Sequence, residues 1–349
     1  MVKHETRLTS RTFIFLMAGL LFFILYLYFF VNISEMIAAI YAANLFYYAI
    51  AGIATVLSVT LHSLTWQFFL GMLHIKVAFR KIIAFVWAGI FVDLIVPAEA
   101  VSGDITKIYL MTKNMNEESV GKIVASVMSS RIISMVVTLG GLVSSSIFLL
   151  FSYPLPQMVL TFVVIVIIYS AAAIILLSYL CFKEATTWRI INWTINFFER
   201  LFRHRWSFSD IRSQAKKTFE AFREGIGLLV RNPKGLTLPL VSSFMAWFFD
   251  VLTVLLVFYA LEFNISFLEI VIIYSLMLSI QAIPLGIPAE VGLTEIVMTS
   301  LFATLGVPIS VSAAATILTR ILAVWFKIII GYIAIQWVGI KALKTTSKL

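Results

Sequence analysis

Two short polar phrases lie deep inside apolar stretches and carry the same residue pattern. Residues 97–99 and 288–290 both read Pro-Ala-Glu, and an acid follows each glutamate after five residues, Asp104 in the first copy and Glu295 in the second. The two copies are 191 residues apart. Ionisable side chains inside a membrane segment are costly and usually functional. Two matched sets therefore indicate a duplicated, transporter-like core with a polar site between its repeats.

A lone arginine follows each phrase within an apolar run. These are Arg131 and Arg320, 189 residues apart, which nearly repeats the offset between the phrases. A guanidinium group in such a place pairs with a carboxylate or offers its forked donors to a phosphate. The first interpretation is structural, the second functional, and they are compatible. Lys327 lies two helical turns after Arg320 and either shares its face or extends toward the membrane surface.

The acids of the two phrases are the main candidates for the lining of a polar cavity. Pro97 and Pro288 suit the first position of a short helix, which would place each glutamate in its first turn. The alternative is that each glutamate only caps that turn, but the repetition with matched arginines favours a functional role. The candidate substrate-binding residues are Glu99, Asp104, Arg131, Glu290, Glu295 and Arg320. Supporting or ion-coupling candidates are Asp93, Lys107, Asp250, Thr294 and Lys327.

The composition identifies an integral membrane protein. The chain is 61% hydrophobic and 12% charged, and its mean hydropathy is +1.03. The net charge of +9 does not predict nucleic-acid binding, because the basic residues lie in loops beside apolar runs. The four histidines form no metal-spaced cluster, so we expect no metal or cofactor, and His62 is interpreted as a packing residue.

Apolar runs and basic residues together predict the topology. Six runs are long enough to span a bilayer, at about 12–31, 44–70, 123–151, 157–182, 237–261 and 311–338. Two further runs, 82–110 and 268–305, are each interrupted by a Pro-Ala-Glu phrase. All but three of the 26 lysines and arginines lie outside the spans, and the connections at 32–43, 152–156, 262–267 and 306–310 contain none. This asymmetry places both termini in the cytoplasm.

The same asymmetry predicts that the interrupted runs are re-entrant hairpins entering from opposite sides. The expected fold is an all-α polytopic helix bundle with an inverted-topology repeat. Its parts are a first transmembrane half at 1–182, a connector at 183–236 and a second half at 237–349. The alternative is that both interrupted runs cross the membrane fully as tight helix pairs.

The connector at 183–236 mixes aromatic and basic residues. Its first part suits a helix lying on the inner leaflet of the cell membrane, held by anionic lipids. Apolar residues then recur at helical spacing until Asn232 and Pro233. A structural connector is favoured over a regulatory arm.

The two phrases resemble a known family. The stretch 97–110 is similar to the first signature of the lysylphosphatidylglycerol synthase transmembrane-region (flippase-like) family, and 287–331 to its second. The matching residues are Gly103, Asp104, Lys107, Tyr109 and Leu110, then Pro288, Gly292, Thr294, Glu295, Gly306, Val307, Arg320 and Trp325. The resemblance covers about 12 to 340. This chain departs from the family at 289–290, where Ala-Glu replaces frequent glycines and leaves the headgroup preference open.

The resemblance implies a translocase that moves a charged or glycosylated phospholipid, or an isoprenoid-phosphate lipid, between leaflets. It looks like the stand-alone membrane part, without the soluble aminoacyl-transferase domain of the larger synthases. We expect no enzyme, since neither a nucleotide-binding motif nor a nucleophile elbow occurs. One rival is a secondary transporter or channel for a small ion or metabolite, and a weaker one is an intramembrane lipid-modifying transferase. The sequence leaves open whether the protein forms a homo-oligomer.

Overall fold

The computed structural model describes most of the chain as helices. The described residues are 17, 20, 21, 23–96, 101–113, 117–152, 156–201, 208–281 and 287–346. Within them, five helices are long and apolar enough to cross a membrane: Leu45–Met72, Ser119–Phe151, Gln157–Cys181, Pro233–Ala260 and Ile309–Val338. These confirm five of the six predicted spans. The remaining span, 12–31, lies partly outside the described residues.

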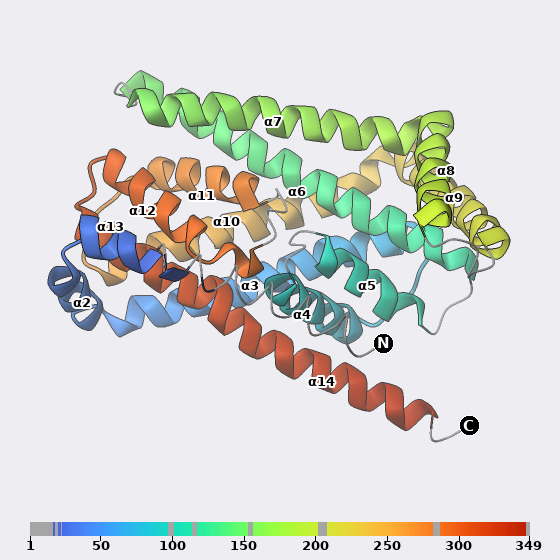
Figure 1. Ribbon diagram of the computed structural model, residues 1–349, viewed down its shortest axis with the longest axis horizontal. Coiled ribbons are helices and arrows are strands. Elements are labelled where there is room, and N and C mark those ends of the chain that lie inside the picture. Colours follow the sequence, from blue (N-terminus) through green and yellow to red (C-terminus); the bar gives the residue numbers. More distant parts are fainter. Residues whose placement is uncertain are drawn as a thin grey trace.

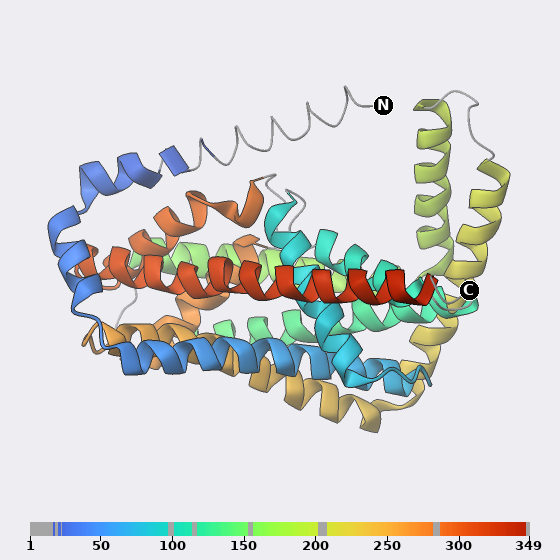
Figure 2. The same ribbon diagram turned by 90° about the horizontal axis from the view of Figure 1, so that it is seen from below.

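The long helices run along one axis of the molecule. They are α3 (Leu45–Met72), α6 (Glu117–Ser152), α7 (Gln157–Phe182), α10 (Thr237–Ala260) and α14 (Lys327–Thr346), and both views show them along this axis (Figures 1 and 2). Helices α8 (Glu184–Leu201) and α9 (Phe208–Arg231) stand across it at one end. The inner face of α9 packs on α6 and buries Phe219, Phe222, Ile226 and Leu229.

The connection expected at 32–43 contains a helix, which corrects the prediction. Helix α2 (Ile33–Tyr41) follows the helical segment Phe23–Phe30 at an angle of 102°. Asn32 caps it, since its side-chain oxygen accepts a hydrogen bond from the Glu35 N–H at 3.4 Å. Helix α2 then packs on α13 (Ile309–Arg320).

Corresponding helices of the two halves are antiparallel. The first residues of α3 meet the last of α10, where the Asn44 N–H donates to the Ala260 carbonyl at 2.7 Å. Farther along, the Ser242 hydroxyl donates to the Leu61 carbonyl at 2.9 Å. Figure 2 shows the two helices side by side with opposite directions. In this pair the second half runs opposite to the first, as an inverted repeat requires.

Each interrupted run folds as two helices with a break between them. The first run gives α4 (Phe79–Ile95) and α5 (Ser102–Thr112). The second gives α11 (Phe267–Gln281), the single turn η2 (Pro288–Glu290) and α12 (Leu293–Thr304). In Figure 1, α4 and α5 occupy the half nearer α8 and α9, and α11 and α12 the half nearer α2.

The packing exchanges partners between the halves. Helix α4 packs along α14, and α11 packs along α6, so each hairpin packs on a long helix of the opposite half. A glycine allows the first approach, because any larger residue at Gly331 would meet the Trp87 carbonyl and Phe91 of α4. This exchange brings η2 against α4 near the middle of the molecule.

Candidate functional site

The acid and the arginine of the second half form a buried ion pair. Glu295 is in the first turn of α12, and Arg320 is the last residue of α13. Arg320 Nε donates to Glu295 Oε1 at 2.7 Å, and each side chain keeps only 9% of its exposure. Arg320 Nη2 also donates to the Ala289 carbonyl. Charge-assisted bonds of this kind are stronger than neutral ones, so Arg320 ties the start of α12 to α13.

Glu295 also caps its own helix. Its Oε2 accepts the Gly292 N–H at 2.6 Å, while its other oxygen holds the arginine. Gly292 has φ +94°, a conformation that only glycine adopts readily. The local sequence therefore fixes the carboxylate from two sides. As predicted, Pro288 begins a short helical turn that contains Glu290, η2, and α12 begins separately at Leu293.

Glu290 lies in a strained turn and is almost fully buried. Both Ala289 and Glu290 have φ +48°, the left-handed region that non-glycine residues rarely occupy. Glu290 is 1% exposed, and its Oε2 accepts the Thr294 hydroxyl at 3.0 Å. Its Oε1 has no hydrogen-bond partner in the described part of the chain. Strain of this kind often marks a functional position.

The first half builds the same pair in a more open place. Asp104 is in the first turn of α5, the position that Glu295 has in α12. Its Oδ2 accepts Arg131 Nη1 at 2.8 Å, and its Oδ1 lies 2.6 Å from Lys107 Nζ. These side chains keep 22% to 28% of their exposure, against 9% in the second half. The predicted candidate Glu99 lies outside the described residues.

Asp93 has a structural contact of its own. Its Oδ1 accepts the Ser102 hydroxyl at 2.7 Å and the Gly103 N–H at 2.9 Å, so it anchors the start of α5 to α4. Gly89 and Gly103 allow the two backbones to approach, since a side chain on either would meet the other's carbonyl oxygen. Asp93 thus serves the first hairpin as a helix cap.

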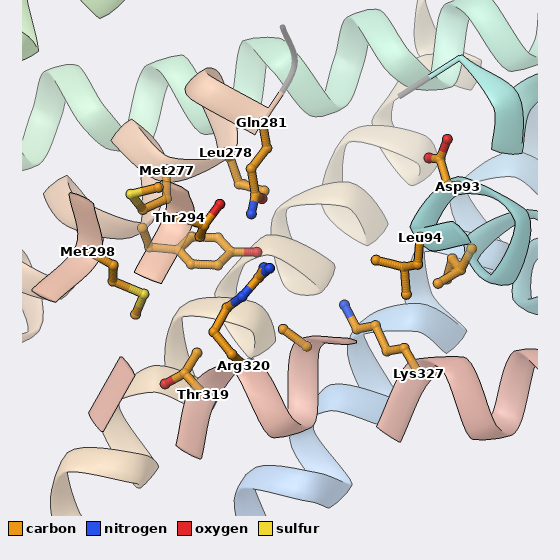
Figure 3. Close-up of a pocket in the computed structure, with 13 residues that line it drawn as sticks. Asp93, Leu94, Met277, Leu278, Gln281, Thr294, Met298, Thr319, Arg320 and Lys327 are labelled. Atoms are coloured by element: carbon orange, nitrogen blue, oxygen red, sulfur yellow. The ribbon is translucent and has the colours of Figure 1, made fainter. Parts of the chain in front are cut away.

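A cavity of about 190 Å³ lies between the two halves. Helices α4, α11, α12 and α13, and the π-helical turn η3 (Ile321–Phe326) with α14, contribute its walls. Its lining residues are Ile90, Asp93, Leu94, Tyr274, Met277, Leu278, Gln281, Thr294, Met298, Thr319, Arg320, Ala323 and Lys327. In Figure 3, Arg320 and Lys327 direct their nitrogen atoms into this space. The cavity therefore presents two cations to whatever enters it.

The structure brings some of the predicted site residues together and leaves others apart. Asp93, Thr294, Arg320 and Lys327 line the cavity. Glu290 and Glu295 lie behind it and contact its lining residues Thr294 and Arg320. The group formed by Asp104, Lys107 and Arg131 is separate from the cavity lining. Tyr274, Gln281 and Thr319 are lining residues that sequence reasoning missed, because uncharged polar residues in apolar runs carry no distinctive signal.

Asp250 pairs with a base that the sequence did not identify. His62 Nε2 of α3 lies 3.4 Å from Asp250 Oδ2 of α10. His62, interpreted as a packing residue, is satisfied by this carboxylate. The pair sits on the antiparallel contact between the two halves described above.

The family model of the lysylphosphatidylglycerol synthase transmembrane region matches residues 16–331. The chain belongs to this family. It is also similar to UPF0104 membrane proteins of three archaea. The protein of Pyrococcus horikoshii is 25% identical over 320 residues, covering 89% of this chain and 93% of its own. Those of Methanothermobacter thermautotrophicus and Methanocaldococcus jannaschii are each 22% identical, covering 88% and 95% of this chain and 89% and 95% of their own.

Family membership and helix content agree. This member of the family is an integral, multi-pass membrane protein with an all-α fold. The recognition made from the two phrases is confirmed, and the match extends over both halves and the connector between them.

Proposed function

We propose that this protein moves a lipid with a phosphate-bearing, anionic headgroup between the leaflets of the cell membrane. The headgroup passes through the cavity between the halves while the apolar tail stays in the bilayer. The observation that carries this proposal is the pair of cations, Arg320 and Lys327, directed into a cavity of about 190 Å³ in a protein of this family.

The charges around the cavity favour an anion. Asp93 is engaged by the start of α5, and Glu295 takes only the Nε donor of Arg320. Lys327 forms no salt bridge with a carboxylate of the described residues. A planar guanidinium beside an ammonium group suits the oxygens of a phosphate.

The helix lengths support re-entrant hairpins. Helices α4, α5, α11 and α12 contain 17, 11, 15 and 12 residues, and about 20 are needed to cross a bilayer. In this proposal each hairpin enters to mid-depth and returns to its own side, with both termini in the cytoplasm. Their inner ends then flank the cavity, where non-helical backbone is tolerated.

The unequal exposure of the two ion pairs supports alternating access. The Glu295–Arg320 pair is buried, and the Asp104–Arg131 pair, its counterpart in the first half, is more open. Two equivalent halves in different environments are what a rocking inverted repeat presents in one of its two end states. The opposite end state would bury the first pair and open the second.

The direct test is lipid exchange in proteoliposomes. Fluorescent phosphatidylglycerol and phosphatidylcholine, labelled on the acyl chain, are quenched from outside with a membrane-impermeant reductant. Lys327→Gln should reduce phosphatidylglycerol exchange about tenfold, because a charge contact to the headgroup is lost. The matched control is Lys122→Gln, whose ammonium pairs with Glu224 away from the cavity, and it should leave exchange unchanged.

Two outcomes would contradict the proposal. If phosphatidylglycerol and phosphatidylcholine exchanged at the same rate, and Lys327→Gln exchanged both as fast as wild type, the cavity would not be the path of the headgroup. Uptake of free glycerol phosphate into the vesicles, without lipid exchange, would instead assign the protein to the transporters of small soluble anions.

A further inference from the structure

A second group of ionisable side chains lies next to the cavity, on the contact between the two halves. His62 of α3 is 3.4 Å from Asp250 of α10. The carboxylate is also close enough to Lys327 for electrostatic attraction, and it interacts with the Tyr274 hydroxyl. Lys327 and Tyr274 both line the cavity. Asp250 therefore stands between a titratable imidazole and a cation that faces the headgroup site.

The surroundings of Asp250 contain few other charges. Helix α3 contributes His62 and the neutral Ser58, α11 contributes Tyr274, and α14 contributes Lys327. On α13, Arg320 is held by Glu295. Helix α6 packs on both α3 and α10, but its Arg131 is held by Asp104. The basic side chains nearest Asp250 are therefore His62 and Lys327.

His62 is the more exposed partner of the pair. The His62 side chain keeps 37% of its exposure and that of Asp250 keeps 14%. Histidine is the side chain that ordinarily changes charge between pH 5 and 8. When the imidazole is protonated it satisfies the carboxylate, and the Lys327 ammonium is released toward the cavity. When the imidazole is neutral, the carboxylate attracts Lys327 instead.

We propose that the His62–Asp250 pair is a proton-binding site coupled to the headgroup site through Lys327. This inference rests on the proposed function and adds its linkage to protons. Binding of an anionic headgroup favours proton uptake at the pair, and by reciprocity a proton favours the anion. A lipid phosphate and a proton would then move together.

Headgroup binding to the full chain in detergent tests the coupling. The probe is glycerophosphoglycerol, a phosphodiester whose charge is constant in this pH range. We expect wild type to bind it about tenfold more tightly at pH 5.5 than at pH 8.0, within the usual range of coupling between sites. Isothermal titration calorimetry measures both values.

Two variants should remove the pH dependence in opposite ways. His62→Asn leaves Asp250 charged and attracting Lys327, so binding should be weak at both pH values. Asp250→Asn releases Lys327, so binding should be tight at both. The matched control is His74→Asn, a histidine beyond the end of α3 with φ +60°, a backbone that asparagine tolerates. It should behave as wild type, and an unchanged pH dependence in His62→Asn would overturn the proposal.

A second measurement needs no ligand and separates the two proposals. If the charged pair forms, His62→Asn should lower the thermal unfolding temperature more at pH 5.5 than at pH 8.0, because only a protonated imidazole makes the charged pair. That result without any binding of the probe would keep the titratable pair and refute the headgroup site. An equal loss of stability at both pH values would refute the pair, whatever the probe does.

Discussion

Breaking the buried ion pair of the second half should destabilise the protein much more than breaking its counterpart in the first. In Glu295→Gln, the amide oxygen can still accept the Gly292 N–H, but its NH₂ then faces the donors of Arg320. The guanidinium is left buried without a carboxylate, which costs about 3 kcal/mol. Asp104→Asn affects side chains that keep 22% to 28% of their exposure, where water compensates and the loss is about 1 kcal/mol.

The single cysteine provides the assay. Cys181 is 8% exposed, so a thiol-reactive fluorophore reports when the helices separate on heating in detergent. At about 2 °C per kcal/mol for a chain of this size, we expect a decrease of about 6 °C for Glu295→Gln and about 2 °C for Asp104→Asn. Each variant replaces an acid by the neutral amide of nearly the same shape, so each is a control for the other.

A double variant tests the reasoning directly. Glu295→Gln combined with Arg320→Gln removes both charges, so it should cost about 2 kcal/mol less than the sum of the single changes. Additive single costs, or equal shifts for the two halves, would show that the buried pair does not stabilise the contact between α12 and α13.

Three further changes probe the frame around the site by the same unfolding assay unless stated. Gly292→Ala should destabilise the protein by about 1 kcal/mol, because φ is +94° there. The control Gly140→Ala, in open space within α6, should be neutral or slightly stabilising. Equal effects of the two changes would contradict the strain at Gly292. Gly121→Ala should push α9 away, since the added carbon meets the backbone of α9, and hydrogen exchange in α9 should rise selectively. Trp66→Phe removes the buried bond from the indole N–H to the Ser126 hydroxyl and should cost about 1 kcal/mol; no loss would show that this bond is dispensable.

The repeat was the most productive signal in the sequence. The matched offsets of 191 and 189 residues predicted that the acids and arginines correspond, and the structure places Asp104 with Arg131 and Glu295 with Arg320. Hydropathy located the spans because length and apolarity are local properties. The matched pairs and the spans could therefore be predicted from the sequence without knowledge of the packing.

The features that the sequence did not predict depend on packing between distant segments. His62 and Asp250 meet only because α3 and α10 are antiparallel in one particular register, and hydropathy does not encode register. Tyr274, Gln281 and Thr319 line the cavity through the exchange of partners between the halves. Helix α2 had a readable signal, Asn32 followed by Glu35 three residues later, but it was hidden in a stretch interpreted as a connection.

The antiparallel halves have a consequence for direction. Helices α5 and α12 both begin at breaks near the middle of the long axis, each capped by a carboxylate oxygen, that of Asp93 or Glu295. The positive ends of both helix dipoles therefore point inward from opposite sides. In the proposed pathway, an anion would therefore meet a helix dipole of the same polarity from either side. These two dipoles would then give the proposed lipid transport no direction, which a gradient of the lipid or of the proton would have to supply.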